Sequence, residues 1–149
     1  MLYSVELAIF MTAFSFIDYS GLYFTGIKKT GLPKKRGGKF VQIFDGANGH
    51  EYLVLSPGEL SVYHANIVER FCAQRKIEGS YNSKKDFFDI RDGAWTVAGG
   101  GVWTMDDDKK ILELAGASLG YGPFEAAGLK SRIIKTGALP GYSITINGL

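Results

Sequence analysis

The sequence contains one cysteine and two histidines, and these low counts exclude two classes of protein. Cys72 alone cannot form an intramolecular disulfide, so the chain is not a disulfide-stapled secreted domain. His50 and His64 are the only imidazoles, and the chain lacks the sets of cysteine and histidine ligands that zinc sites use. We therefore expect no metal ion, no cofactor, and a reducing, cytoplasmic compartment.

Long hydrophobic runs are also lacking. The apolar stretch LAIFMTAFSFI covers residues 7–17, whereas a membrane-spanning helix needs about 20 residues. No lysine or arginine precedes Lys28, so the basic region that opens a signal peptide is missing. We expect residues 7–17 to be buried structure, strand or helix, and we expect no membrane partner.

The chain also lacks a large excess of either positive or negative charge. With 17 basic and 15 acidic residues the net charge is +2, which gives no general footprint for nucleic acid, and a nucleic-acid partner is not expected. Basic residues do gather in KKTGLPKKRGGK at residues 28–39. The Gly and Pro residues of this run predict a solvated surface loop, while a patch facing an anion or an acidic partner stays open.

The residues that are abundant favour a sheet-rich fold. The 149 residues predict a single domain, 1–149. Hydrophobic residues make up 46% and charged residues 21% of the chain, as in ordinary globular proteins. The 20 glycines and the 13% of aromatic residues favour many tight turns and strands. Together with the helices below, they predict an α+β domain.

Strands and turns alternate through most of the chain. KFVQIF at residues 39–44 alternates as a strand does, and YLVL at 52–55 is its returning partner across a DGANG turn. Further strands are predicted at residues 94–97, 101–105, 110–114 and 142–146, with a short one near 86–90. A DDDK sequence at 106–109 is interpreted as a hairpin tip, because consecutive carboxylates seldom converge on one metal ion.

Two helices are predicted between these strands. The sequence SPGE at residues 56–59 has the pattern of a capping box, and the helix it opens would end near Arg75. His64 falls on the apolar side of that helix at 100° per residue. A second helix is predicted from Pro123 through Ile134. The small residues before Pro123 form a loop that resembles an anion-binding nest at the start of a helix.

Familiar catalytic arrangements are missing from the sequence. Cys72 and His64 are eight residues apart on one predicted helix, about 12 Å along its axis, so they cannot form a catalytic pair. No nucleophile elbow, Walker A loop or dinucleotide fingerprint occurs in the required context. The residues that remain indicate an anion site with a possible nucleophile or base, namely His64, Lys39 and the glycine-rich loop at residues 118–120.

Five short motifs resemble those of the Janus/phosphohistidine phosphatase family. They are KFVQI at 39–43, YHANI at 63–67, GGG at 99–101, DKKI at 108–111 and SLGYGP at 118–123. They occur in the family's order and cover about residues 39–146. Residues 1–38 lie outside the match as an N-terminal extension.

The resemblance implies a small monomeric α+β domain, with a single mixed sheet of about six strands flanked by two helices. It also implies metal-free removal of phosphate from phosphohistidine in proteins. By position, His64 matches the catalytic histidine, as nucleophile or general base, and Lys39 matches the phosphate-site lysine. The backbone amides of Ser118, Leu119 and Gly120 match the phosphate-binding loop. The implied partner is a phosphorylated protein or a small phosphorylated ligand.

Two departures from the family pattern favour an alternative. Val102 and Ser56 stand where the family has arginines, and neither side chain can replace a bidentate guanidinium. The candidate replacements are Arg36, Lys84, Lys85 and Arg91. Without a replacement the same fold would be a phosphate-binding or phosphoprotein-binding module with weak or no turnover.

Overall fold

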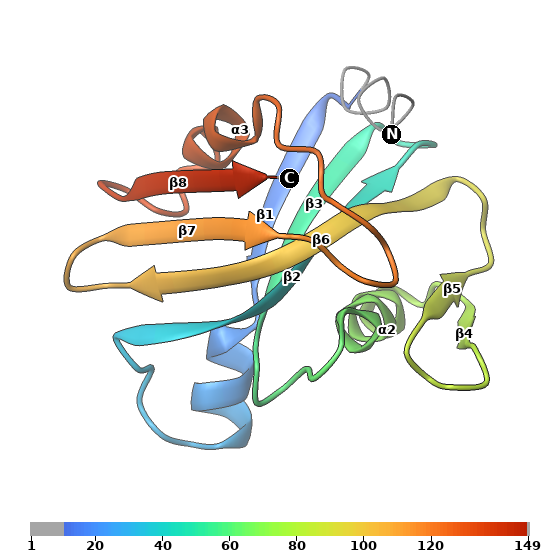
Figure 1. Ribbon diagram of the computed structural model, residues 1–149, viewed down its shortest axis with the longest axis horizontal. Helices are drawn as coiled ribbons and strands as arrows, with labels where there is room; N and C mark the ends of the chain where they lie inside the picture. The colour runs from blue at the N-terminus through green and yellow to red at the C-terminus, as the bar shows by residue number, and fades with distance from the viewer. Residues whose placement is uncertain (1–10, 149) are drawn as a thin grey trace.

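A computed structural model describes residues 11–148, which form an α+β fold around one main sheet (Figure 1). The sheet is mixed and has six strands in the order β1-β3-β2-β6-β7-β8, which confirms the expected fold class. Its strands are β1 (Ala13–Asp18), β2 (Lys35–Asp45), β3 (His50–Pro57), β6 (Trp95–Asp106), β7 (Ile111–Gly116) and β8 (Ser143–Gly148).

Two hairpins make the centre of the sheet, and two parallel strands extend it. β2 pairs antiparallel with β3 and with β6, and β6 pairs antiparallel with β7. β1 and β8 are added in parallel to β3 and β7. Both hairpin turns are closed by an aspartate: Asp45 accepts the N–H of Ala47, and Asp106 accepts the N–H groups of Asp108 and Lys109.

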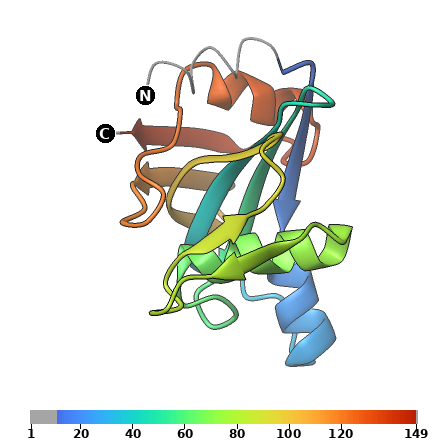
Figure 2. The ribbon, with the colours of Figure 1, turned by 90° about the vertical axis from the view of Figure 1, so that its right-hand side faces the viewer.

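Helices lie on both faces of the sheet. The helix α2 (His64–Arg75) contacts β2 and β3, and α3 (Leu129–Lys135) contacts β1 and β8. A small antiparallel hairpin of β4 (Gly79–Tyr81) and β5 (Phe88–Ile90) packs beside α2 (Figure 2). The π-helix η1 (Gly21–Ile27) follows β1 and extends from the lower end of the molecule in Figure 1. No helix among residues 11–148 is long and apolar enough to cross a membrane.

The protein has two hydrophobic cores, one on each face of the sheet, because successive side chains of a strand point to opposite faces. Phe40 of β2 faces the core that includes α3, whereas Val41 and Ile43 face the core under α2. Trp103 fills the first core and donates its indole N–H to the carbonyl oxygen atoms of Lys39 and Ser56. The sheet therefore has no solvent face at its centre, and β2 passes between the two cores.

A β-bulge at Ala98 interrupts β6. In the pairing with β2, Ile43 lies opposite Val97 and Gln42 lies opposite Gly99, so Ala98 is an extra residue. Before the bulge, Trp95 and Val97 pack against the core under α2. The sequence analysis predicted two strands separated by the glycine run, and the structure has one continuous strand with this bulge.

The first predicted helix begins later than its sequence pattern indicates. Ser56 lies in β3, pairs with Lys39 of β2, and shares a hydrogen bond with the Ser61 hydroxyl. The capping box predicted at residues 56–59 is therefore wrong. The helix begins at His64, and the Asn66 side chain accepts the N–H of Tyr63 at 2.9 Å. Sheet pairing of Ser56 outweighs its local preference for a helix start.

The second predicted helix is also shorter than expected. Pro123 forms a β-bridge with Gly100, and α3 begins only at Leu129, after Gly128 with φ of 72°. The loop at residues 116–123 therefore does not enter a helix, and that part of the prediction is wrong. In the N-terminal part, residues 13–17 lie in β1, and residues 7–10 lie outside the described residues. Lys35 and Lys39 belong to β2 rather than to a loop.

Candidate functional site

The residues that the sequence analysis selected line one cavity. His64, Lys39, Ser118, Leu119 and Gly120 surround a space of about 660 Å³, a volume typical of sites for small molecules. The other lining residues are Tyr63, Asn82, Asp86, Phe87, Val102 and Ala117. Strands β2 and β6, the start of α2, the loop at residues 117–122 and the connection between β4 and β5 thus meet at this point.

His64 is held in one tautomer by the backbone of β6. Its Nε2 lies 2.9 Å from the carbonyl oxygen of Gly101, and because a carbonyl only accepts, Nε2 carries the hydrogen. Neutral His64 then has an unprotonated Nδ1, for which the described residues provide no hydrogen-bond partner. Burial lowers the pKa of His64 below 6.5, the Gly101 carbonyl opposes this shift, and the charge of Lys39 adds to it.

The glycine run of β6 gives the His64 ring its place. A Cβ on Gly100 would lie 2.5 Å from the Phe40 carbonyl oxygen and 2.8 Å from Cδ2 of His64. Neither approach is compatible with a side chain, so the imidazole packs directly against the glycine backbone. The sequence motif at residues 99–101 is therefore explained by close packing of the histidine onto the strand.

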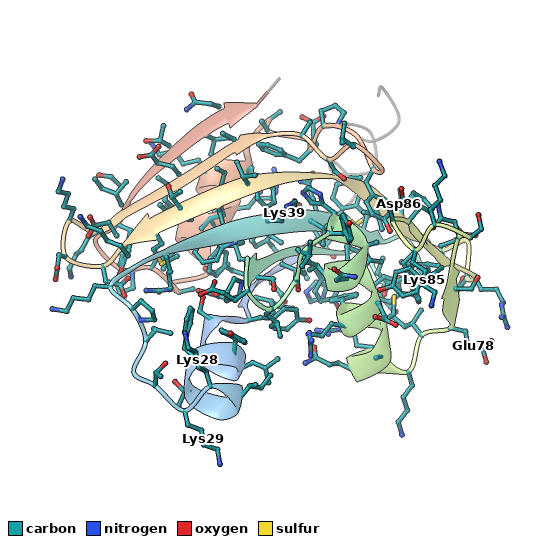
Figure 3. The ribbon with its side chains drawn as sticks, turned by 60° about the horizontal axis from the view of Figure 1, so that its bottom comes forward. Lys28, Lys29, Lys39, Glu78, Lys85 and Asp86 are labelled. Carbon is teal, nitrogen blue, oxygen red and sulfur yellow. The ribbon has the colours of Figure 1, made fainter. Side chains whose placement is uncertain are left out.

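Lys39 supplies positive charge to the cavity. It lies in β2, between Ser56 of β3 and Val102 of β6, its two cross-strand partners. Its position on β2 and that of Asp86 in the β4–β5 connection can be followed in Figure 3. Within residues 11–148, no carboxylate forms an ion pair with Lys39, so its ammonium group is available to an anion.

The loop at residues 118–122 closes on itself and leaves two amides free. The Ser118 N–H donates to the Gly122 carbonyl at 3.0 Å, and the Gly122 N–H returns to Ser118 at 2.8 Å. The Ser118 N–H is thus already hydrogen-bonded within the loop. The sequence analysis expected three free amides here, and that expectation is wrong for Ser118. The N–H groups of Leu119 and Gly120 make no hydrogen bond to any described residue, and both residues line the cavity.

Tyr121 fixes that loop to the rest of the site, a role that sequence reasoning missed. Its hydroxyl accepts the N–H of Phe88 at 2.9 Å and donates to the Phe88 carbonyl at 2.7 Å. Burial raises the pKa of Tyr121 well above its usual range, so the hydroxyl stays protonated. Gly122 also accepts the N–H of Gly100 at 3.1 Å. Loop and histidine are therefore attached to the same strand segment.

The β4–β5 connection adds three lining residues that the sequence analysis did not select. The Asn82 side chain donates to the Asp86 carboxylate at 2.7 Å and accepts the N–H groups of Asp86 and Phe87. The carboxylate places one negative charge on the wall of the cavity. The only feature of the sequence that could have indicated these lining residues is the apolar Phe87, which directly follows the polar sequence NSKKD.

The positions where the family has arginines carry no cation here. Val102 lines the cavity and is 47% exposed, and Ser56 is buried with its hydroxyl bonded to Ser61. Arg36 forms an ion pair with Asp107 at 2.6 Å, and Arg91 forms one with Glu78. The lining residues include neither arginine, and they include neither Lys84 nor Lys85. Of the described lysines and arginines, Lys39 alone lines the cavity.

The remaining reactive groups lie elsewhere. Cys72 is buried in the core under α2, where desolvation raises its pKa to about 11. Among residues 11–148, no three His, Cys, Asp or Glu side chains gather in a way that could hold a metal ion. Lys28 and Lys29 lie at the end of η1, away from Lys39 (Figure 3).

No protein-family model matches the chain, and no curated protein matches it. The resemblance to the Janus/phosphohistidine phosphatase family therefore depends on the five motifs, and membership stays a prediction.

Proposed function

We propose that the protein is a phosphohistidine phosphatase-like hydrolase, which removes phosphate from a histidine-phosphorylated protein without a metal ion. One observation carries the proposal: Nε2 of His64 is bonded to the Gly101 carbonyl, so Nδ1 of the neutral ring carries the lone pair, and His64 and Lys39 line the same cavity. A neutral, oriented imidazole beside a cation suits an attack on a phosphoryl group.

The reaction breaks one P–N bond, and His64 has two ways to assist. As general base, Nδ1 takes a proton from water while the water oxygen forms a bond to phosphorus. As nucleophile, Nδ1 itself forms the new P–N bond, and water later breaks it. In both cases the leaving imidazole of the substrate keeps the electron pair of the broken bond and gains a proton. The three phosphoryl oxygens retain negative charge throughout.

Lys39 and the loop amides are the groups that stabilise this charge in the proposal. The ammonium group of Lys39 has no competing carboxylate among the described residues. The N–H groups of Leu119 and Gly120 have no hydrogen-bond partner within residues 11–148, and Tyr121 holds their loop in place before any ligand arrives. Donors placed in advance stabilise a transition state without further reorganisation.

The decisive experiment compares the two histidines. Phosphate release from a histidine-phosphorylated peptide is measured for the wild type, His64→Ala and His50→Ala, with a chelator present. His50 is the matched control, because it shares a hydrogen bond with Ser15 and does not line the cavity. We expect His64→Ala to lose at least about 10²-fold in rate and His50→Ala to keep its activity. Equal release from all three proteins would contradict the proposal.

A second candidate function is favoured because Lys39 is the one lysine or arginine of the described residues that lines the cavity. Val102 lies beside Lys39 where an arginine would strengthen binding in the transition state, and Asp86 adds a negative charge to the wall. The alternative is a phosphate-binding or phosphoprotein-binding module. It predicts amide NMR shifts at Leu119 and Gly120 on titration with phosphate, without phosphate release. In either case we propose a monomer in the cytoplasm.

A further inference from the structure

Four apolar side chains line the cavity, and three of them are largely exposed. Tyr63 is 53% exposed, Val102 is 47% exposed, and Leu119 is exposed as fully as in an extended chain. Phe87, which is partly buried, completes the group, and all four residues line the cavity. We call Tyr63, Phe87, Val102 and Leu119 the apolar rim. They come from four separate segments of the chain, and such a concentration of exposed apolar side chains at one cavity indicates a binding surface.

Part of the apolar rim is held in place by contacts within the protein. The Phe87 ring stacks on Tyr121 with 4.6 Å between ring centroids, and Tyr121 is bonded to Phe88. The Phe87 ring also packs over Gly120, where an added Cβ would lie 3.4 Å from Cδ2. The backbone of Tyr63 is fixed at the start of α2 by its N–H bond to Asn66, and Val102 lies on β6. Side chains that are ordered before a ligand arrives lose little conformational entropy on binding.

We propose that the apolar rim binds a large apolar side chain of the peptide segment that carries the phosphorylated residue, adjacent to that residue in sequence. This inference rests on the proposed function, because it places the phosphoryl group at Lys39. Lys39 and Val102 are cross-strand partners, so a phosphoryl group at the lysine brings its neighbouring residue against the rim. The occupant is therefore a protein segment that is both anionic and apolar.

Leu119 distinguishes a protein segment from a small phosphorylated molecule. Its side chain is entirely exposed although its residue lines the cavity. A ligand enclosed in the cavity cannot cover such a side chain, whereas a chain that continues across the mouth can cover it. Free phosphate has no apolar surface to contribute, so its binding would leave the whole rim in water.

The test uses two histidine-phosphorylated peptides that differ at one position, Phe or Ser directly after the phosphorylated residue. For each peptide kcat/KM is measured, and Kd is measured for its non-hydrolysable phosphonate analogue. We expect the wild type to favour the Phe peptide at least about tenfold in both quantities, which corresponds to about 1.4 kcal/mol. A small aromatic phosphonate is included as a third ligand, and we expect it to bind more weakly than the Phe peptide.

Two variants assign the preference to the rim. Tyr63→Ser removes an exposed ring but keeps the start of α2, because Ser is a good N-cap residue. Ile27→Ser is the matched control, since Ile27 is 56% exposed on η1 and does not line the cavity. We expect the Phe-to-Ser ratio to fall at least about threefold in Tyr63→Ser, an incomplete loss because three rim residues remain. Ile27→Ser should keep the wild-type ratio.

The outcomes separate this inference from the proposed function. Selective binding of the Phe analogue without hydrolysis of either peptide would support the rim and contradict the phosphatase. Hydrolysis of both peptides with equal kcat/KM and equal Kd would support the phosphatase and overturn the rim. The rim is likewise overturned when neither analogue binds, when the small aromatic phosphonate binds as tightly as the Phe peptide, or when Tyr63→Ser keeps the full ratio.

Discussion

Lys39 and Val102 lie directly opposite each other on β2 and β6, and both line the same cavity. A cation and an apolar side chain are thus adjacent on one face of the sheet, in the part of the β2–β6 pairing that is regular. The neighbouring position on the other side of Lys39 is Ser56, which is buried and bonded to Ser61. The charge of Lys39 is therefore unsupported by any neighbouring cation on its rung of the sheet.

An arginine at position 102 should strengthen the site. Val102→Arg places a guanidinium across the strand pair from Lys39, where it can bind phosphoryl oxygens in a bidentate manner. We expect kcat/KM for a histidine-phosphorylated peptide to rise at least about tenfold, equivalent to about 1.4 kcal/mol. Steady-state kinetics on the Ser peptide measure this effect without a contribution from the apolar rim.

Thr104→Arg is the control for Val102→Arg. It adds the same charge two residues along β6, opposite Gly37 and outside the set of lining residues. We expect kcat/KM to remain near the wild-type value. A fall in kcat/KM for Val102→Arg, with a fully active wild type, would show that the reaction does not need a second cation.

Gly100→Ala should disturb His64 directly. The added Cβ meets the Phe40 carbonyl at 2.5 Å and the imidazole at 2.8 Å, and a backbone atom cannot move away cheaply. We expect a loss of about 1–3 kcal/mol in the free energy of unfolding and a fall in kcat of up to about 10²-fold from a misplaced imidazole. Urea denaturation and steady-state kinetics measure the two effects. Gly26→Ala is the control, because its Cβ has no neighbour closer than 4.0 Å.

Tyr121→Phe should loosen the loop that carries the free amides. Removal of the hydroxyl leaves the N–H and carbonyl of Phe88 without their partner, at a cost of about 1–3 kcal/mol. We expect weaker phosphate binding by calorimetry and faster hydrogen exchange at the Phe88 amide. Tyr142→Phe removes a hydroxyl that donates to Asp107, outside the cavity. It should leave phosphate binding unchanged, and equal weakening in both variants would contradict the role given to Tyr121.

The low pKa of His64 should appear in both activity and stability. Burial lowers this pKa below 6.5, so the neutral imidazole persists in the folded protein at pH values where the unfolded chain is already protonated. The unfolded chain then binds more protons, so the free energy of unfolding decreases as pH falls from about 6.5 toward the folded pKa. The stabilising contribution of neutral His64 is fully present above that window.

NMR titration of the His64 ring is the direct measurement of that pKa. We expect a midpoint below 6.5, and an acidic limb of kcat/KM that follows it rather than the ordinary histidine value. Urea denaturation across the same pH range should lose part of its pH dependence in His64→Ala. A midpoint at or above the ordinary value would show that the ring is solvated rather than packed on Gly100.

The strands of the sheet and the members of the site were largely predictable, because both depend on local patterns. Alternation placed Phe40 and Val41 on opposite faces of β2, as the two cores confirm. His64, Lys39 and Leu119 were selected from residue type and motif resemblance, and the structure brings them to one cavity. Their chemical roles stay predictions.

The helix boundaries and the walls of the site were not predictable, because both depend on contacts between distant segments. The local sequence at Ser56 predicts a helix start, but the pairing of Ser56 with Lys39 keeps it in β3. The local sequence at Pro123 predicts a first helical residue, but Pro123 forms a β-bridge with Gly100 instead. Phe87 lies far along the chain from Lys39, His64 and Leu119, with which it lines the cavity. No periodic pattern of the sequence reports such contacts.

The extra residue at Ala98 sets which side of the sheet each later side chain of β6 occupies. Trp95 and Val97 precede it on the α2 side, and Trp103 follows it on the α3 side although it also has an odd number. Deletion of Ala98 would leave Val97 opposite Ile43 and Gly99 opposite Gln42, so both halves of the strand could keep their faces. Loss of the bulge with Ala98 taken into the ladder would instead shift the pairing with β2 by one residue. If the first half kept its place, the indole of Trp103 would then turn to the cavity side, and Val102 would turn toward the core that includes α3. The bulge, rather than the composition of the strand, thus keeps Val102 at the cavity.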